Sequence, residues 1–352
     1  MITTTNRIDT LFLGIPTDLI SITDSDKFQR GTIDLMDGTL KSQSLTTKEM
    51  SGLNKISVGY GEGNTTEVQI SAKILGNSYL DGITSNNIEG VFDTIRKYGY
   101  IDFDTNEVIE NSDVRRVDVF KNMKVGENVG DYIDSVKYLM NNSMIEKSNK
   151  WGSESVVLRR NVKSYNERII CYDKHTELLR GKNKSFLNQF DKSKILGGSM
   201  GVMRVETNNT GKGVFQKIRE RFNTETNKLS EILESEENVV WNIYNRMKGA
   251  DTQQIIKPNK TNEWMKLDLK TTWNEQLIDT GYRSIVMMLK GDYELCKSYV
   301  QSHYNGSSKP TRSLKMMKEY CREYNRWESL SQLRDTQFEI KLKEIETFLK
   351  VS

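Results

Sequence analysis

A change in hydrophobic periodicity divides this chain into two parts. Over roughly the first 205 residues, short apolar runs alternate with turn signals, which is typical of β-strands. From about Phe215 onward, apolar residues recur three or four positions apart, which indicates amphipathic helices. We therefore expect an α+β fold, with a central antiparallel sheet flanked by helices in residues 1–215 and an α-helical domain in residues 216–352.

The strands and helices of the first part can be placed by residue range. Asp37-Gly38 is a strong tight-turn pair, so the segment around it reads as a hairpin. We expect strands or hairpins at Asp9–Pro16, Gly31–Leu40, Lys55–Gly63, Glu67–Leu75, Arg115–Phe120, Trp151–Arg160, Glu167–Lys174 and Gly201–Thr207. We expect helices at Ile88–Gly99, Val129–Asn142 and Ser185–Phe190.

Composition narrows the class of protein. Of the 352 residues, 28% are charged and 36% hydrophobic, which is the balance of a globular protein rather than a disordered one. No apolar run approaches the ~20 residues of a membrane helix. The N-terminal segment lacks a signal-peptide pattern, so we expect a cytoplasmic protein with no membrane partner.

Cysteine, histidine and net charge exclude several kinds of site. Cys171, Cys296 and Cys321 have no CxxC spacing, which argues against a zinc knuckle or a disulfide framework. Two histidines are too few for a His-rich metal site. The net charge of +3 does not by itself indicate nucleic-acid binding, which would require basic residues to gather in one region.

Charged side chains interrupt several expected strands. Residues i and i+2 of a strand share a face of the sheet. Four such pairs contain a charged or tyrosine side chain: Asp118 with Arg116, Glu206 with Arg204, Tyr172 with Lys174 and Glu154 with Val156. A carboxylate on a core-facing position is costly unless it is paired or metal-bound. Converging carboxylates would suit Mg²⁺ or Mn²⁺. Alternatively, the acids of the first two pairs form outward cross-strand ion pairs with arginine.

Tyr172 adds a nucleophile to this set. With a metal polarising the scissile phosphate, the tyrosine could attack it and form a 5′-phosphotyrosine, leaving a free 3′-hydroxyl. Lys174 could lower the pKa of the tyrosine or neutralise charge in the transition state. The chain holds fifteen tyrosines, so Tyr172 alone is weak evidence.

Basic residues gather around the same segments, unlike the chain as a whole. This gathering favours a DNA-facing surface, and the alternative is a basic solvated loop. The candidate DNA contacts are Arg116, Arg159, Arg160, Lys163, Tyr165, Arg168, His175, Arg180, Lys182, Lys184 and Arg204. The helices after residue 216 could read duplex DNA, recruit a host helicase or mediate homodimerisation. Their pattern of apolar residues does not distinguish among these three roles.

Four short motifs stand in a fixed order: Arg116-Val117-Asp118, Trp151-Gly152-Ser153-Glu154, Tyr172-Asp173-Lys174-His175-Thr176-Glu177 and Arg204-Val205-Glu206. Together with the opening segment Ile8–Pro16, they resemble the gene II replication initiators of filamentous bacteriophages. They are similar, more distantly, to the Rep initiators of Gram-positive rolling-circle plasmids. The resemblance covers about residues 8–210.

This resemblance implies a relative of the HUH-endonuclease fold and a rolling-circle replication initiator of a phage or plasmid in a bacterial cytoplasm. It implies metal-dependent nicking and rejoining of origin DNA, presented single-stranded or extruded at the nick site. Tyr172 would then be the nucleophile and Lys174 the assisting cation. Asp118 and Glu206 would bind Mg²⁺ or Mn²⁺, with Glu154 and Glu177 as further candidates.

Two departures from the family pattern keep other functions open. The chain has no His-hydrophobe-His triplet, and its tryptophan strand reads W-G-S-E rather than W-E-S. One alternative is a non-catalytic origin-binding initiator or repressor on the same scaffold. Another is a plasmid mobilisation relaxase, which the missing histidine pair disfavours.

Overall fold

The structure, a computed structural model, describes residues 6–28, 30–33, 35–36, 38–46, 50–61, 64–137, 145–148, 154–162, 165–210, 214–248, 264–265, 272–303 and 311–351. The chain forms two compact units, one of residues 1–252 with 342–352 and the other of residues 253–341.

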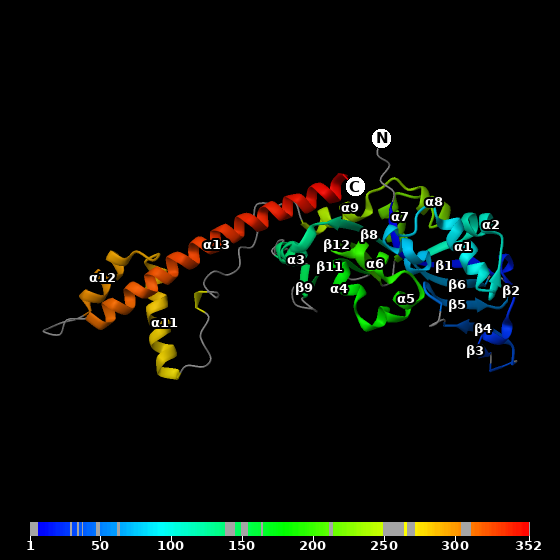
Figure 1. Ribbon diagram of the computed structural model, residues 1–352. Helices are drawn as coiled ribbons and strands as arrows, with labels where there is room; N and C mark the ends of the chain where they lie inside the picture. The colour runs from blue at the N-terminus through cyan, green and yellow to red at the C-terminus, as the bar shows by residue number, and fades with distance from the viewer. Residues whose placement is uncertain are drawn as a thin grey trace. The chain divides into compact units, whose positions relative to one another are not determined.

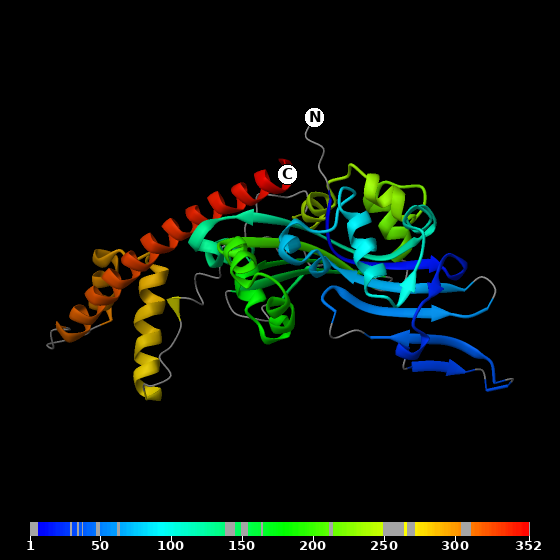
Figure 2. The ribbon, with the colours of Figure 1, turned by 45° about the vertical axis from the view of Figure 1, so that its right-hand side comes forward.

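An antiparallel sheet, ten-stranded in the part of the chain described, forms the first unit (Figure 1). The strand order is β3-β4-β5-β6-β1-β8-β12-β11-β10-β9, with β3 to β6 together at one end (Figure 2). The strands are β1 (Arg7–Pro16), β3 (Arg30–Ile33), β4 (Leu40–Leu45), β5 (Leu53–Gly59), β6 (Thr65–Ser71), β8 (Asp113–Lys124), β9 (Ile145–Ser148), β10 (Ser155–Val162), β11 (Tyr165–Asp173) and β12 (Val202–Thr210). Short strands β2 (Ser21–Ile22) and β7 (Ile101–Asp102) pair separately. The expected α+β class with a large antiparallel sheet is confirmed.

The two faces of the sheet differ because side chains alternate along each strand. On β12, Met203 and Val205 join the main hydrophobic core, whereas Arg204 and Glu206 point to the opposite, polar face. Helices cover the apolar face, and Ile345 near the end of the chain belongs to the same core. The covering helices are α3 (Val129–Lys137), α7 (Val214–Phe222), α9 (Val239–Lys248) and the last turns of α13 (Thr311–Val351).

The remaining helices of this unit also contribute side chains to the main core, among them Phe92, Val108 and Leu229. These helices are α1 (Ile88–Lys97), α2 (Thr105–Asn111), α4 (Lys174–Leu178), α5 (Lys184–Gln189), α6 (Lys192–Ser199) and α8 (Leu229–Glu234). A 3-10 segment, Ala72–Asp81, follows β6 and brings Tyr79 toward the polar face of the sheet. The α4 helix begins directly where β11 ends, so these two elements meet at a sharp junction.

Helices α7 to α9 belong to the sheet unit, although the change in periodicity placed the boundary at residues 215/216. Glu167 of β11 is buried and accepts hydrogen bonds from Arg221 of α7 at 2.9 Å and Arg246 of α9 at 3.0 Å. The apolar sheet face must also be covered, and these helices cover it. Periodicity therefore marked the end of the strands and not the end of the compact unit.

The second unit is helical. It contains α11 (Trp273–Met288), α12 (Tyr293–Ser302) and the first part of α13, around a core that includes Val286, Cys296 and Cys321. All three cysteines of the chain are free and buried. Among the residues described, no helix combines the length and the apolar character needed to cross a membrane.

Candidate active site on the polar face of the sheet

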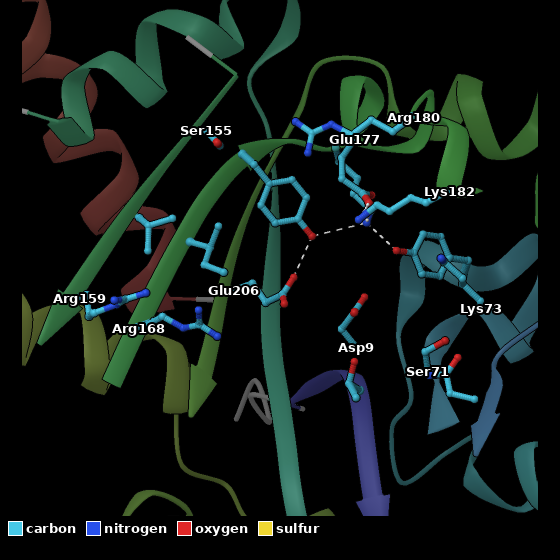
Figure 3. Close-up of a pocket in the computed structure, with 17 residues that line it drawn as sticks. Asp9, Ser71, Lys73, Ser155, Arg159, Arg168, Glu177, Arg180, Lys182 and Glu206 are labelled. Atoms are coloured by element: carbon cyan, nitrogen blue, oxygen red, sulfur yellow. Dashed lines mark hydrogen bonds and ion pairs between the residues drawn. The ribbon is translucent and has the colours of Figure 1, made fainter. Parts of the chain in front are cut away.

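A cavity of about 430 Å³ lies against the polar face of the sheet. Its lining includes Tyr172 of β11 and Glu206 of β12, which are brought together because Tyr172 pairs with Arg204, two residues from Glu206. Six basic and three acidic residues line it: Lys73, Arg159, Arg168, Lys174, Arg180 and Lys182, with Asp9, Glu177 and Glu206. Figure 3 shows Glu206 between an arginine pair on one side and Lys73 and Lys182 on the other.

The tyrosine hydroxyl has an acceptor in the cavity. Tyr172 Oη donates a hydrogen bond of 2.8 Å to Oε2 of Glu206 (Figure 3). Burial, followed by the negative charges of Asp9 and Asp118, raises the pKa of Glu206 to about 7. Burial and the charge of Glu206 raise the pKa of Tyr172 well above its usual value. The tyrosine is therefore protonated at neutral pH, next to a carboxylate poised to accept its proton.

Lys174 lies beside the tyrosine although it is not on the same strand. The strand ends at Asp173, whose carboxylate caps α4 by accepting hydrogen bonds from the backbone N–H groups of His175 and Thr176. Lys174 is thus the first residue of α4, and its buried Nζ lies 3.5 Å from Tyr172 Oη. The expectation that it shares a strand face with Tyr172 is wrong, because the capping turn and not strand alternation brings the two together.

Several partners hold the lysine ammonium in place. Lys174 Nζ donates to Tyr79 Oη at 2.5 Å and to Glu177 Oε2 at 2.9 Å. Burial and the nearby charge of Arg204 lower the pKa of Lys174 to about 8. Although burial alone would raise it, Lys174 and Lys182 lower the pKa of Glu177. Burial is the largest cause of the pKa shift of Tyr172, and the net shift is upward, so a lowered tyrosine pKa is not found.

Arg204 lies inside the protein rather than on a DNA-facing surface. Its side chain is 0% exposed and stacks on Phe120, with the guanidinium carbon 3.7 Å from the ring centroid. It donates to Asp9 at 2.6 Å and to Asn122 at 2.9 Å. Arg204 therefore positions Asp9 at the cavity wall, and a direct contact with DNA is excluded by its burial.

The four carboxylates predicted to bind a metal do not converge. Glu177 is held by Lys174 and Lys182, and Glu154 pairs with Arg180 at 3.2 Å. Asp118 forms an ion pair with Arg116, as the alternative interpretation predicted. The Asp118 side chain does not face outward, however, because it is only 1% exposed.

Glu206 alone of the predicted set contacts the tyrosine hydroxyl. Asp9 and Asp118, on neighbouring strands, act on Glu206 through their charge. Within the described ranges, no group of three or more His, Cys, Asp or Glu side chains is placed to hold a metal ion. The donor set as arranged does not fit Mg²⁺ or Mn²⁺, and we derive no step through a metal.

The other predicted DNA contacts fall into three groups. Arg159, Arg168, Arg180 and Lys182 line the cavity. Lys184 is exposed at the start of α5, whereas the His175 ring links α4 to α6 through Leu196 O at 3.2 Å and Ser199 Oγ at 3.0 Å. Lys163 and Trp151–Ser153 lie outside the described residues, as do the side chains of Arg160 and Tyr165.

Sequence reasoning missed several residues of the cavity, and three of them carry charge or contact Lys174. Asp9 interrupts an apolar strand, so the criterion that selected Asp118 could have found it. Lys73, which donates to Asn183 at 2.8 Å, lies in a segment read as a plain strand, and Tyr79, which contacts Lys174, follows that segment. No local pattern identifies these two, since only the 3-10 segment brings them to the site.

Comparisons with protein-family models, with curated proteins and with solved structures found no match to this chain. The resemblance to replication initiators therefore rests on the four motifs and their order.

Proposed function

We propose that this chain is a tyrosine-dependent DNA strand nickase and ligase that initiates rolling-circle replication. The observation that carries the proposal is the hydrogen bond from Tyr172 to Glu206 inside a cavity with a basic excess. A hydroxyl next to a proton acceptor is the arrangement that an oxygen nucleophile needs. A basic lining suits the charge of a phosphodiester and of its transition state.

The proposed reaction transfers a backbone phosphate from a 3′-oxygen of DNA to the tyrosine. Tyr172 Oη attacks the phosphorus of a backbone phosphate while Glu206 takes the hydroxyl proton. The P–O3′ bond breaks, the 5′-phosphate stays on the tyrosine, and the leaving 3′-oxygen takes a proton from water. Lys174 offsets negative charge that develops near the tyrosine oxygen. Rejoining reverses the step: the 3′-oxygen attacks the phosphorus of the phosphotyrosine and its proton passes to water, the P–O bond to Tyr172 breaks, and the tyrosine oxygen regains its proton from Glu206.

The metal requirement implied by the resemblance stays a prediction. The nicking assay should therefore have arms with Mg²⁺, with Mn²⁺ and with a chelator. Nicking that survives chelation would agree with the arrangement of the carboxylates. Nicking lost on chelation would require Asp9, Asp118 and Glu206 to give up their present partners for a cation.

The experiment uses a supercoiled plasmid carrying the DNA that flanks the protein's own coding region. Wild-type protein should convert it to nicked circles, and Tyr172→Phe should not, while both bind the DNA equally. Tyr60→Phe is the matched control, because Tyr60 hydrogen-bonds Gln43 and does not line the cavity. Equal nicking by Tyr172→Phe would refute the assignment. Tight binding without nicking by the wild type would favour the non-catalytic origin-binding protein.

A further inference from the structure

The cavity floor is built as a ladder of cross-strand pairs between β10 and β11. Three pairs in register line the cavity: Ser155 with Tyr172, Val157 with Ile170, and Arg159 with Arg168. Residues two apart on a strand share a face, so these rungs follow one another along the same surface. The floor thus runs from the nucleophile, across an apolar rung, to a pair of guanidinium groups.

The arginine rung places two positive charges directly opposite each other on neighbouring strands. Like charges directly opposite each other in a sheet are destabilising. Arg168 donates from Nη2 to Asn208 at 2.7 Å, but its buried Nε has no hydrogen-bond partner. Among the side chains described, none forms an ion pair with either arginine. Burial and the charge of Arg159 lower the pKa of Arg168. Two guanidinium groups that line a cavity, one of them with an N–H that makes no hydrogen bond, are suited to bind an anion.

The distance to the nucleophile indicates which anion. Arg168 lies four residues from Tyr172 along β11, roughly 13 Å in an extended strand. This backbone separation favours a phosphate at the arginine rung that is distinct from the one at the tyrosine hydroxyl. The apolar rung between them, Val157 with Ile170, offers a surface for the sugar or base that separates two phosphates.

We propose that Arg159 and Arg168 form a second phosphate subsite, which holds a backbone phosphate of a single DNA strand laid along the β10–β11 ladder away from the one that Tyr172 attacks. This inference rests on the proposed function for its substrate. Inorganic phosphate offers the same charge, so the experiment must separate a free anion from a phosphodiester chain.

The test measures binding of a fluorescent single-stranded oligonucleotide by anisotropy, over a range of salt concentrations. All proteins carry Tyr172→Phe, so that binding is read without cleavage. Adding Arg168→Gln or Arg159→Gln should weaken binding about tenfold. Each should also reduce the slope of log affinity against log salt by about 0.7, the value for one phosphate of a single strand. Arg168→Lys should keep most of the slope because it keeps the charge.

Two controls sharpen the result. Lys97→Gln removes an exposed charge on α1, away from the cavity lining, and should leave the salt slope unchanged. Glu146→Gln removes a negative charge from the β9 residue whose backbone is in register with Arg159, and should not weaken binding. A competition arm adds inorganic phosphate: displacement of the oligonucleotide only at far higher concentrations supports a phosphodiester chain as the ligand.

Unchanged affinity and slope in both arginine variants, with thermal unfolding showing them folded, would overturn the subsite. So would inorganic phosphate that binds as tightly as the oligonucleotide, since the site would then serve a free anion. If the wild-type protein never nicks DNA yet the arginine variants lose the slope, the subsite stands and the nickase proposal fails. The two failures are therefore distinguishable.

Discussion

At the scale of single residues, the environment of Glu206 and Lys174 determines when the site can react. Catalysis as proposed needs Glu206 as a carboxylate and Lys174 as an ammonium. Their pKa values of about 7 and about 8 lie close together. Because the groups are in one electrostatic network, the two limbs of a pH profile belong to the network as a whole.

The single-turnover nicking rate should follow a narrow bell-shaped pH profile. It should rise as Glu206 loses its proton near pH 7 and fall as Lys174 loses its proton near pH 8. Lys174→Arg should shift the alkaline limb upward, because an arginine keeps its charge. Glu206→Gln should slow nicking about 10²–10⁴-fold across the profile. A nicking rate that shows neither the acid nor the alkaline limb would contradict the assignment of base and cation.

Glu206 should also make stability depend on pH. Its folded-state pKa of about 7 lies above the usual 4.5, so the folded state keeps a proton that the unfolded state loses between these values. Stability should therefore fall as pH rises from about 4.5 to 7 and stay lower above it. Glu206→Gln should raise the free energy of unfolding at pH 8 by on the order of 1–3 kcal/mol. At pH 4 the two proteins should unfold alike in thermal melts, and a destabilised variant at pH 8 would contradict the account.

The sequence identified the residues assigned to the proposed reaction better than it identified their neighbours. Tyr172, Lys174 and Glu206 were selected because they interrupt strands or follow a motif, which is a local signal. Tyr79 was not, because it reaches Lys174 only through a contact across 95 residues of chain. Long-range contacts of this kind decide which carboxylates are neutralised, and this is why the predicted four-carboxylate metal site does not form.

At the scale of elements, the junction of β11 and α4 is the feature that makes the site. The cap at Asp173 turns the chain directly after Tyr172 and places Lys174 beside it. Periodicity predicted a strand over Glu167–Lys174, which carries Tyr172, and the structure confirms a strand there that ends at Asp173. Periodicity did not predict the short helix α4, because its start is defined by one capping carboxylate, Asp173, and not by a repeat of apolar residues.

Asp173→Ala should therefore affect both stability and activity. Loss of the cap should cost about 1 kcal/mol of unfolding free energy, and nicking should slow because Lys174 is no longer held near the tyrosine. Asp104→Ala is the matched control, since Asp104 caps α2 through the backbone N–H groups of Asn106 and Glu107. It should lose similar stability in urea unfolding and keep its nicking rate. Equal activity in the two variants would show that the junction does not position the lysine.

At the scale of the whole molecule, the sheet depends on helices that follow it in the chain. Glu167 of β11 is 2% exposed and joins Arg221 of α7 to Arg246 of α9. Removing one partner of a buried ion pair leaves an uncompensated charge. Glu167→Ala should lower the free energy of unfolding by about 3–5 kcal/mol, measured by urea unfolding. A loss under about 1 kcal/mol, the worth of a surface pair, would contradict this.

The central claim is that Tyr172 becomes covalently linked to DNA. The most direct measurement is to trap the reaction with single-stranded DNA from the flanking region, digest protein and DNA, and locate the nucleotide adduct by peptide mass spectrometry. The account predicts one adduct, a phosphotyrosine at Tyr172, absent from Tyr172→Phe and present in Tyr60→Phe. Nicked DNA with an adduct on another residue, or with no adduct at all, would contradict it.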